Sequence, residues 1–349
     1  MKVAILFDPG GAHWEQKDVI AAVEGVRSVQ AHLRQVGYET SVIPIRLNDW
    51  RYIGKVRQAD VVFNLCEGLD GHSKYEDWVV GTLELAGTPY TGCRPWATSV
   101  CHRKHVSNTL LAANGIPVPR FALARRNKVP THLELPVIVK PAAEDASLGI
   151  DAGAVCTSRK SLKTRIALMA EQWDSVLVQE YVAGREFNVG FIGKTMLPIA
   201  EITFENMPEG SWPILTYASK WDEGSPEDLG SVPVCPAEIT PELARKLEKI
   251  GREAWELMCE GEGYGRVDLR VDSSGEPYVL EVNPNPDLSE NAGLARMARA
   301  IGWDYSRLLQ EVIRETLERA AARKAGELAG SAGVPVSASV PAGGRASGD

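Results

Sequence analysis

The chain has 349 residues, of which 44% are hydrophobic and 24% are charged, and its formal net charge is −8. At about 150 residues per domain this length predicts two or three globular domains, and the composition excludes collagen, coiled coil and overall intrinsic disorder. A weakly acidic chain without a basic run is a poor candidate for a nucleic-acid-binding protein.

The first hundred residues alternate strand-like and helix-like patterns. Apolar, β-branched runs predict buried strands at 3–7, 41–45 and 61–65. The spacing of apolar residues predicts helices at 20–36, at 77–86 and from residue 95 onward. Because strands that alternate with helices indicate a parallel sheet, residues 1–100 are predicted to form a Rossmann-like α/β domain.

Two further units and a tail follow. In residues 101–186 the patterns predict helices at 105–114 and 162–172 and strands at 136–139 and 176–181. In residues 187–324 they predict strands at 187–192, 197–202, 265–271 and 278–282 and helices at 240–259 and 304–324. The turn at 272–275 joins the last two strands into a hairpin. Residues 325–349 are mostly Ala, Gly, Ser, Pro and Val and are predicted to be disordered.

Neither the apolar segments nor the cysteines indicate an exported protein. No apolar run approaches the length of a membrane span, and the apolar start at 1–8 is too short for a signal-peptide core. The six cysteines are scattered without a CxxC pair, which favours reduced, mostly buried thiols over a catalytic cysteine. We therefore expect a cytoplasmic protein without a membrane partner.

Polar residues alternate with apolar ones on both strands of the predicted hairpin. Arg266 and Asp268 share one face of the first strand, and Glu281 and Asn283 share one face of the second. Two carboxylates and an amide in one patch are oxygen ligands that suit Mg²⁺. A solvated polar face is the alternative, but the rigid exit at 284–286 is typical of a site loop.

Two other segments have the character of a phosphate and nucleotide site. Lys140 ends a buried strand, and the loop 144–149 (EDASLG) has small residues that let backbone N–H groups approach a phosphate. The strand at 176–182 ends in polar residues at a glycine corner, 184–187 (GREF), which can meet a base and a ribose. Taken alone, both signals are weak, and a plain surface loop explains the first one better.

Taken in this order, the segments resemble the ATP-grasp enzymes and, more closely, the D-alanine–D-alanine ligase family. The resemblance runs from residue 1 to about 320, and its specific parts are 88–92 (TPYTG), Lys104, 135–141 (LPVIVKP), 184–187 (GREF), 235–237 (CPA), 266–268 (RVD) and 281–284 (EVNP). It implies an α+β ATP-grasp fold in which two subdomains, 101–186 and 187–324, clamp ATP between them. It also implies two Mg²⁺ ions, with Mn²⁺ as a substitute, and a homodimer. The implied reaction joins a carboxylate to an amine through an acyl phosphate.

The same resemblance assigns the nucleotide contacts. Lys104 and Lys140 should hold the ATP phosphates, and Ser147 and its neighbours should cover the transferring phosphate, which Lys220 also reaches. The other contacts that it implies are Gln179, Glu180 and Val182 with the adenine and Glu186 with the ribose hydroxyls.

Metal binding and catalysis are assigned to the hairpin and the two loops. The resemblance implies that Asp268, Glu281 and Asn283 bind Mg²⁺. Arg266 should face the amino-acid substrate and stabilise negative charge on the acyl phosphate and the tetrahedral intermediate. With Ser147 and Lys220 it makes up the expected catalytic set.

The departures from the family pattern lie on the amino-acid side. Ala146 stands where the family has a serine, Trp221 where it has a tyrosine, and Ala292 where it has a serine that meets the second substrate's carboxylate. Asp287 replaces a glycine and either pairs with a cationic amine or caps the next helix. Glu15 is a candidate for the glutamate that holds the first D-alanine.

Three functions remain open. The favoured one is a carboxylate–amine ligase of this family that acts on non-standard amino-acid or peptide substrates, because loss of hydroxyl contacts changes discrimination strongly. The second is a true D-alanine–D-alanine ligase of cell-wall synthesis. The third is a nucleotide-binding regulator without ligation, against which the intact Lys140, Arg266 and metal residues argue.

Overall fold

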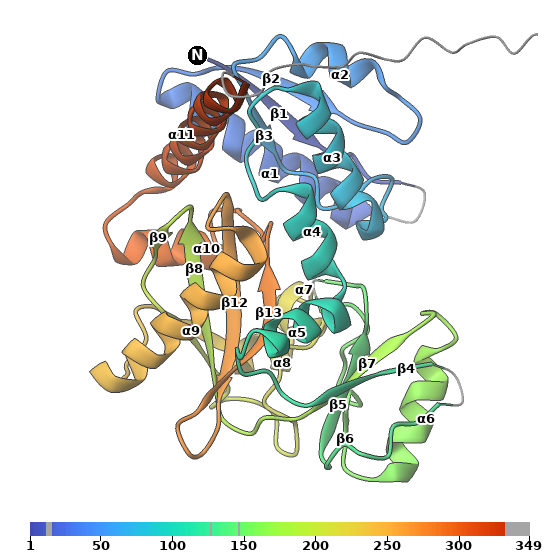
Figure 1. Cartoon of the computed structure of the whole chain (residues 1–349). Coiled ribbons are helices and arrows are strands. Elements are labelled where there is room, and N and C mark those ends of the chain that lie inside the picture. Colours follow the sequence, from blue (N-terminus) through green and yellow to red (C-terminus); the bar gives the residue numbers. More distant parts are fainter. Residues whose placement is uncertain (12–15, 126–127, 146, 332–349) are drawn as a thin grey trace, which may run out of the picture.

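The computed structural model describes residues 1–11, 16–125, 128–145 and 147–331, and these residues form three β-sheets that follow one another along the chain (Figure 1). The first sheet is parallel and the other two are antiparallel. This confirms the predicted class, an α/β unit followed by two α+β units.

The N-terminal sheet has the strand order β2–β1–β3. Its strands are β1 (Lys2–Phe7), β2 (Glu39–Pro44) and β3 (Val61–Asn64). All of β3 and most of β1 are buried, as expected for strands covered on both faces. The helices of this unit are α1 (Gln16–Gln35), α2 (Arg51–Val56), η1 (Ser73–Tyr75), α3 (Glu76–Ala86) and α4 (Pro95–His102).

The middle sheet has the strand order β4–β7–β5–β6. Its strands are β4 (Phe121–Ala124), β5 (Val137–Pro141), β6 (Val155–Cys156) and β7 (Val176–Glu180). Helix α5 (Lys104–Ala113) precedes the sheet, and α6 (Arg159–Met169) packs on it. Leu162 and Ile166 of α6 share one core with Val139 and Val178 of the two central strands.

The C-terminal sheet has the strand order β11–β10–β8–β12–β13. Its strands are β8 (Arg185–Ile192), β9 (Thr195–Met196, paired with β8), β10 (Ala200–Thr203), β11 (Val232–Val234), β12 (Tyr264–Val271) and β13 (Pro277–Asn283). Helix α9 (Pro241–Cys259) packs on this sheet through Trp255, whose ring stacks on Phe191 at a centroid distance of 5.3 Å. Two short helices, α7 (Ala218–Trp221) and α8 (Pro226–Gly230), lie between β10 and β11 in the chain.

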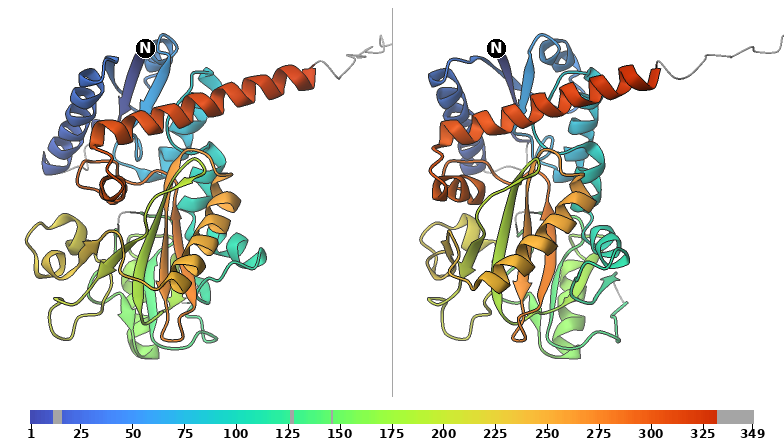
Figure 2. Two further views of the ribbon diagram at one scale, coloured as in Figure 1. Left: turned by 90° about the vertical axis from the view of Figure 1, so that its left-hand side faces the viewer. Right: turned by 60° about the vertical axis from the view of Figure 1, so that its left-hand side comes forward.

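The last two helices, α10 (Gly293–Ala300) and α11 (Tyr305–Ser331), return the chain to the N-terminal unit. Figure 2 shows α11 lying along that unit, and it contacts α1 and β3. The helix continues to Ser331, so the predicted disorder is wrong for residues 325–331. Alanine, glutamate and leucine in this stretch favour a helix over an irregular chain. Residues 332–349 lie outside the described residues.

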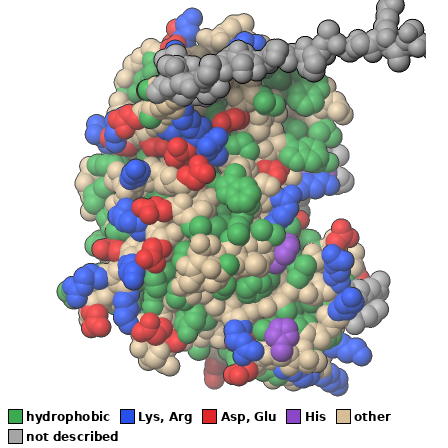
Figure 3. Space-filling view, viewed as in Figure 1, with side chains coloured by type: hydrophobic (Ala, Val, Ile, Leu, Met, Phe, Trp, Pro, Cys, Tyr) green, Lys and Arg blue, Asp and Glu red, His purple; other side chains and the backbone are tan. Residues whose placement is uncertain are grey.

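Cysteines and surface agree with a reduced globular protein. All six cysteines are free thiols, and all except the half-buried Cys235 are buried. Acidic and basic side chains are interspersed on the face seen in Figure 3. Within the described ranges, no helix is long and apolar enough to cross a membrane.

Candidate active site

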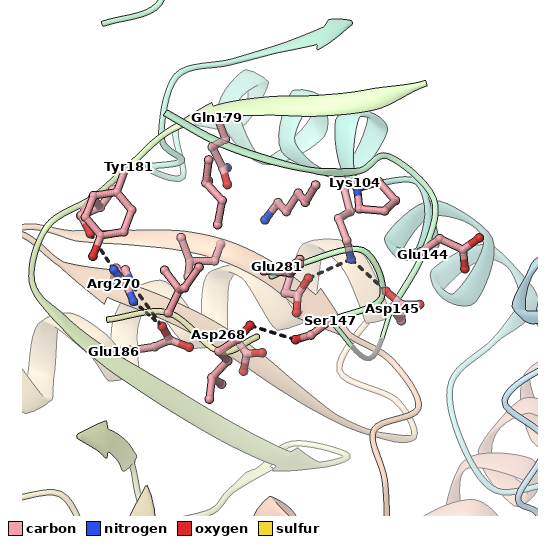
Figure 4. A pocket seen from close by; sticks show the side chains of 18 of the residues that line it. Lys104, Glu144, Asp145, Ser147, Gln179, Tyr181, Glu186, Asp268, Arg270 and Glu281 are labelled. Carbon is pink, nitrogen blue, oxygen red and sulfur yellow. Dashed lines mark hydrogen bonds and ion pairs between the residues drawn. The ribbon is translucent and has the colours of Figure 1, made fainter. Parts of the chain in front are cut away.

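A cleft lies between the middle and the C-terminal sheet (Figure 4). Strands β5 and β7 line one side, β8, β12 and β13 line the other, and the loop 144–149 adds a third wall. The predicted site residues that line the cleft are Lys104, Lys140, Ser147, Gln179, Glu180, Val182, Glu186, Asp268 and Glu281.

The four polar residues of the hairpin face one another across β12 and β13. Asp268 is the register partner of Glu281, and Arg266 is the partner of Asn283. Arg266 holds both oxygens of Asp268, at 2.6 Å from Nε and 2.9 Å from Nη2. The amides of Asn283 and of Asn188 on β8 also donate to Asp268, at 2.9 and 2.7 Å. The period-two pattern predicted this cluster except for Asn188.

Three lysines surround Glu281. The buried Lys104 ammonium lies 2.8 Å from Glu281 Oε2 and 2.9 Å from Asp145 Oδ1. Burial alone would lower the pKa of Lys104, but the two carboxylates raise it above its usual value. Burial lowers the pKa of Lys140 to about 8 against the opposing pull of Glu281, and burial also lowers the pKa of Lys220. Burial would raise the pKa of Glu281, but the charges of the three lysines hold it well below its usual value.

The hairpin fits a magnesium site by the chemistry of its donors. Asp268 and Glu281 supply carboxylate oxygens, and Asn283 uses its amide nitrogen for the bond to Asp268, which leaves its amide oxygen for another partner. Oxygen donors of this kind, next to lysines that can bind phosphate, suit Mg²⁺ held jointly by protein and nucleotide. These three residues would hold the ion.

The loop 144–149 is fastened from two sides. The Ser147 hydroxyl donates to the carbonyl of Leu215 at 3.1 Å, and the residue has a φ of +59°. The Glu144 carboxylate accepts a bond from the Ser73 hydroxyl of the N-terminal unit at 2.9 Å. The loop is therefore held next to the lysines by both neighbouring units, as a cover for a phosphate requires.

A polar contact anchors the same loop to α4, close to a carboxylate of α3. Asp145 Oδ2 lies 2.9 Å from Nδ1 of His102, in addition to its bond with Lys104. Glu76, His102 and Asp145 place ligand-type atoms within 4.8 Å of one another. Glu76 in turn accepts a bond from Asn285, in the loop after β13, at 2.9 Å.

The predicted adenine end of the cleft lies along β7. Gln179 is buried and points into the cleft, and its amide nitrogen has no hydrogen-bond partner in the described chain. The Glu180 carboxylate turns to the other face of β7, where it accepts a bond from the backbone N–H of Glu134 at 2.8 Å. The backbone of Glu180, rather than its carboxylate, is therefore the part available to a nucleobase in the cleft. Val182 and Glu186 line the cleft beyond it.

The residues predicted to contact the amino-acid substrates form fewer contacts with the cleft than those of the predicted nucleotide site. Glu15 lies outside the described residues. Trp221, at the end of α7, is 47% exposed. Asp287 accepts bonds from the backbone N–H and the hydroxyl of Ser289, at 2.7 and 2.8 Å, so it caps a turn. Ala292 begins α10 without a side-chain cap.

Two charged residues at or near the site have no role among those predicted from the sequence. Glu67 follows β3, and burial raises its pKa to about 7 with help from the charges of Asp287 and Asp145. Its position after a parallel strand was a usable signal, because ligands bind at the carboxyl ends of such strands. Arg270 lines the cleft and continues the alternation of Arg266 and Asp268 along β12.

The family model and the named ligases among the relatives point to one family. The family model described as D-ala D-ala ligase C-terminus matches residues 110–314, more than half of the chain. A relative from Sinorhizobium fredii, described as uncharacterized protein y4sG, is 33% identical and is matched over 74% of each chain. A D-alanine–D-alanine ligase of Thermotoga maritima is 27% identical over 90% of this chain and 97% of its own.

A solved structure has the same fold. The D-alanine–D-alanine ligase from Bacillus anthracis, complexed with ATP, superposes with a TM-score of 0.72 at 23% identity. The match covers 93% of this chain and 99% of that one. At this identity the likeness establishes the ATP-grasp architecture.

Proposed function

The chain belongs to the D-alanine–D-alanine ligase family of ATP-grasp enzymes, and on this basis we propose that it is an ATP-dependent ligase that joins a carboxylate to an amine. The observation that carries the proposal is that the charges of Lys104, Lys140 and Lys220 all act on the Glu281 carboxylate of the hairpin, which lines the cleft together with the first two lysines. Such a set of cations is suited to a phosphoryl group in transfer.

The proposed reaction has two steps. The substrate carboxylate takes the terminal phosphoryl group of ATP, which gives an acyl phosphate and ADP, and the amine then attacks the acyl carbon and releases phosphate. Lys104, Lys140 and Lys220 hold the phosphates, and Ser147 covers the one in transfer. Arg266 stabilises the oxygen that gains charge. Bound Mg²⁺ would neutralise phosphate charge between the nucleotide and the hairpin.

Water must be kept from the acyl phosphate, and the loop 144–149 is placed to do so. Its bonds to Ser73 and Leu215 fasten it to segments on both sides of the cleft. Exclusion of water protects a reactive intermediate from hydrolysis. We therefore assign Ser147 both to the phosphate and to the closure of this wall.

We further propose that the substrates differ from a pair of D-alanines. Ala292 has no hydroxyl for a substrate carboxylate, and Trp221 supplies an exposed indole in place of a phenol. The charges of Asp287 and Asp145 raise the pKa of Glu67 on this side. Such an arrangement disfavours a second carboxylate and favours an amine-bearing substrate without one.

A true D-alanine–D-alanine ligase is the second candidate. The observation that favours it is the match to D-alanine–D-alanine ligases over nearly their whole length. A regulator that binds nucleotide without turnover is disfavoured, since Lys140, Arg266, Asp268 and Glu281 are all present and assembled.

Release of ADP separates these candidates. The full chain is incubated with ATP and Mg²⁺ and with paired D- and L-amino acids, small peptides, amines and simple carboxylates, and the products are identified by mass spectrometry. A product other than the D-alanine dipeptide, with D-alanine inert, supports the proposal. The D-alanine dipeptide from D-alanine alone would instead establish the second candidate. ATP binding without turnover over the whole panel would overturn ligation.

A further inference from the structure

Arg270 is a buried cation at the proposed nucleotide end of the cleft. None of the roles predicted from the sequence involves it. It lies on β12, two residues beyond Asp268, and it is 3% exposed. It is the register partner of Glu186 on the neighbouring strand β8. Figure 4 shows both side chains pointing into the cleft below Tyr181.

Arg270 binds only one of the two carboxylate oxygens of Glu186. Arg270 Nε and Nη2 both donate to Oε2 of Glu186, at 3.0 and 2.9 Å. Among the described residues no hydrogen bond ends on the other carboxylate oxygen, Oε1. The guanidinium therefore fixes the orientation of the carboxylate and leaves one acceptor free at the wall of the cleft.

Arg270 also ties two other parts of the wall to β12. Its Nη1 donates to the carbonyl of Val182 at 3.0 Å, and its Nη2 donates to the carbonyl of Pro213. Its guanidinium lies 5.0 Å from the centre of the Tyr181 ring and 5.6 Å from that of Phe204. One side chain thus holds the segment after β7, the segment before α7 and the carboxylate of β8 in fixed relation.

We propose that Arg270 is a positioning residue for the nucleotide ribose, acting through Glu186. By fixing Oε2, it presents Oε1 to a ribose hydroxyl, and by holding the Val182 carbonyl it sets the distance between this carboxylate and the backbone proposed to meet the base. The inference rests on the proposed ATP site, but it concerns selection among nucleotides and does not depend on which amino acid is used.

The test is the affinity of the full chain for ADP, 2′-deoxyADP and 3′-deoxyADP, with Mg²⁺ present, by titration calorimetry. A hydrogen bond to a charged acceptor typically contributes enough for about a tenfold preference or more. The wild type should therefore bind ADP about tenfold more tightly than at least one deoxy analogue. In E186Q and R270M this ratio should fall to about one or two, because the oriented acceptor is lost.

Variants separate positioning from loss of structure. R270M leaves the buried Glu186 carboxylate without its cation, and R270M/E186Q removes both charges together. R270K keeps the positive charge but lacks the two guanidinium donors that fix the carboxylate. The double variant should show the same ratio as either single variant, and R270K an intermediate one. R185M is the matched control, because Arg185 is the residue before Glu186 but pairs with Glu201 at 2.6 Å. It should keep the wild-type ratio.

Each outcome decides something. A wild-type ratio retained in folded R270M or in R270K, or additive losses in the double variant, would overturn the role of Arg270. Tight ADP binding by the wild type without any ribose preference would overturn it as well and would leave the ligase function standing. Absence of ADP binding would overturn the proposed function itself.

Discussion

Replacing Glu67 by Gln should stabilise the protein at pH 8 and leave its stability nearly unchanged at pH 4.5. The pKa of this carboxyl rises from 4.5 to about 7 in the folded protein, through burial and through the charges of Asp287 and Asp145. Between these pH values the folded protein keeps a proton that the unfolded chain has released. The wild type therefore loses stability as the pH rises through this window, and E67Q does not.

The size of the effect follows from the pKa. A full rise from 4.5 to 7 corresponds to about 3 kcal/mol of free energy of unfolding. Protein atoms surround the Glu67 carboxyl and desolvate it, but the side chain still reaches solvent, which screens its repulsion from the other carboxylates. We therefore expect E67Q to exceed the wild type by about 1 kcal/mol at pH 8.

Urea unfolding of both proteins at pH 4.5, 6, 7 and 8 measures this difference. E24Q serves as the matched control, because Glu24 is an exposed glutamate on α1. Its difference from the wild type should not vary with pH. A difference between E67Q and the wild type that is constant from pH 4.5 to 8, or that grows toward low pH, would refute the raised pKa of Glu67.

Three further predictions test the hairpin, the glycine corner and the last helix. E281A should reduce the rate of ADP release by about 100-fold or more, because it removes the proposed metal ligand and the partner of Lys104. Its circular dichroism spectrum should stay that of the wild type. Retained turnover would contradict the metal assignment. G184A should lower the free energy of unfolding by about 2 kcal/mol or more, because a Cβ there would lie 1.9 Å from the carbonyl oxygen of Val271 at a φ of +155°; an unchanged urea midpoint would show that the corner can move. R319M should lower the free energy of unfolding by about 2–3 kcal/mol in urea, because it removes the donors to the buried carbonyls of Tyr90 and Gly92. An unaltered urea midpoint would mean that the docking of α11 does not depend on this contact.

The long elements could be predicted from the sequence because burial imposes a clear period on them. The fully buried β3 has an unbroken apolar run over its first three residues, and α9 has one apolar face that packs on a sheet. The short elements carry no such signal. β4 has only four residues, of which three are partly or fully exposed, and α2 has six. Their conformation depends on contacts with residues far away in the chain, which the local sequence does not reveal.

The hairpin site was predictable for a related reason. Residues two apart on a strand share a face, so Arg266 and Asp268 had to lie together, and the hairpin turn brought Glu281 and Asn283 opposite them. Arg270 follows the same rule and was still missed. Its partner Glu186 lies on β8, and that pairing depends on the order of strands in the sheet, which local pattern does not fix.

The charges around the cleft show why the amino-acid side resisted prediction. The nucleotide side takes its lysines from segments that the family resemblance identifies, and the family match confirms that resemblance. The other side takes Glu67, Asp145 and Asp287 from three loops of different units, and only folding brings them within reach of one another.

Lys104 joins the two sides, because it bonds both to Glu281 of the hairpin and to Asp145 of the loop 144–149. A phosphate that binds Lys104 must share this ammonium with Asp145. Occupancy of the nucleotide side therefore changes the charge felt by the acidic residues opposite. Because Asp145 is among the charges that raise the pKa of Glu67, we expect nucleotide binding at Lys104 to change the pKa of Glu67.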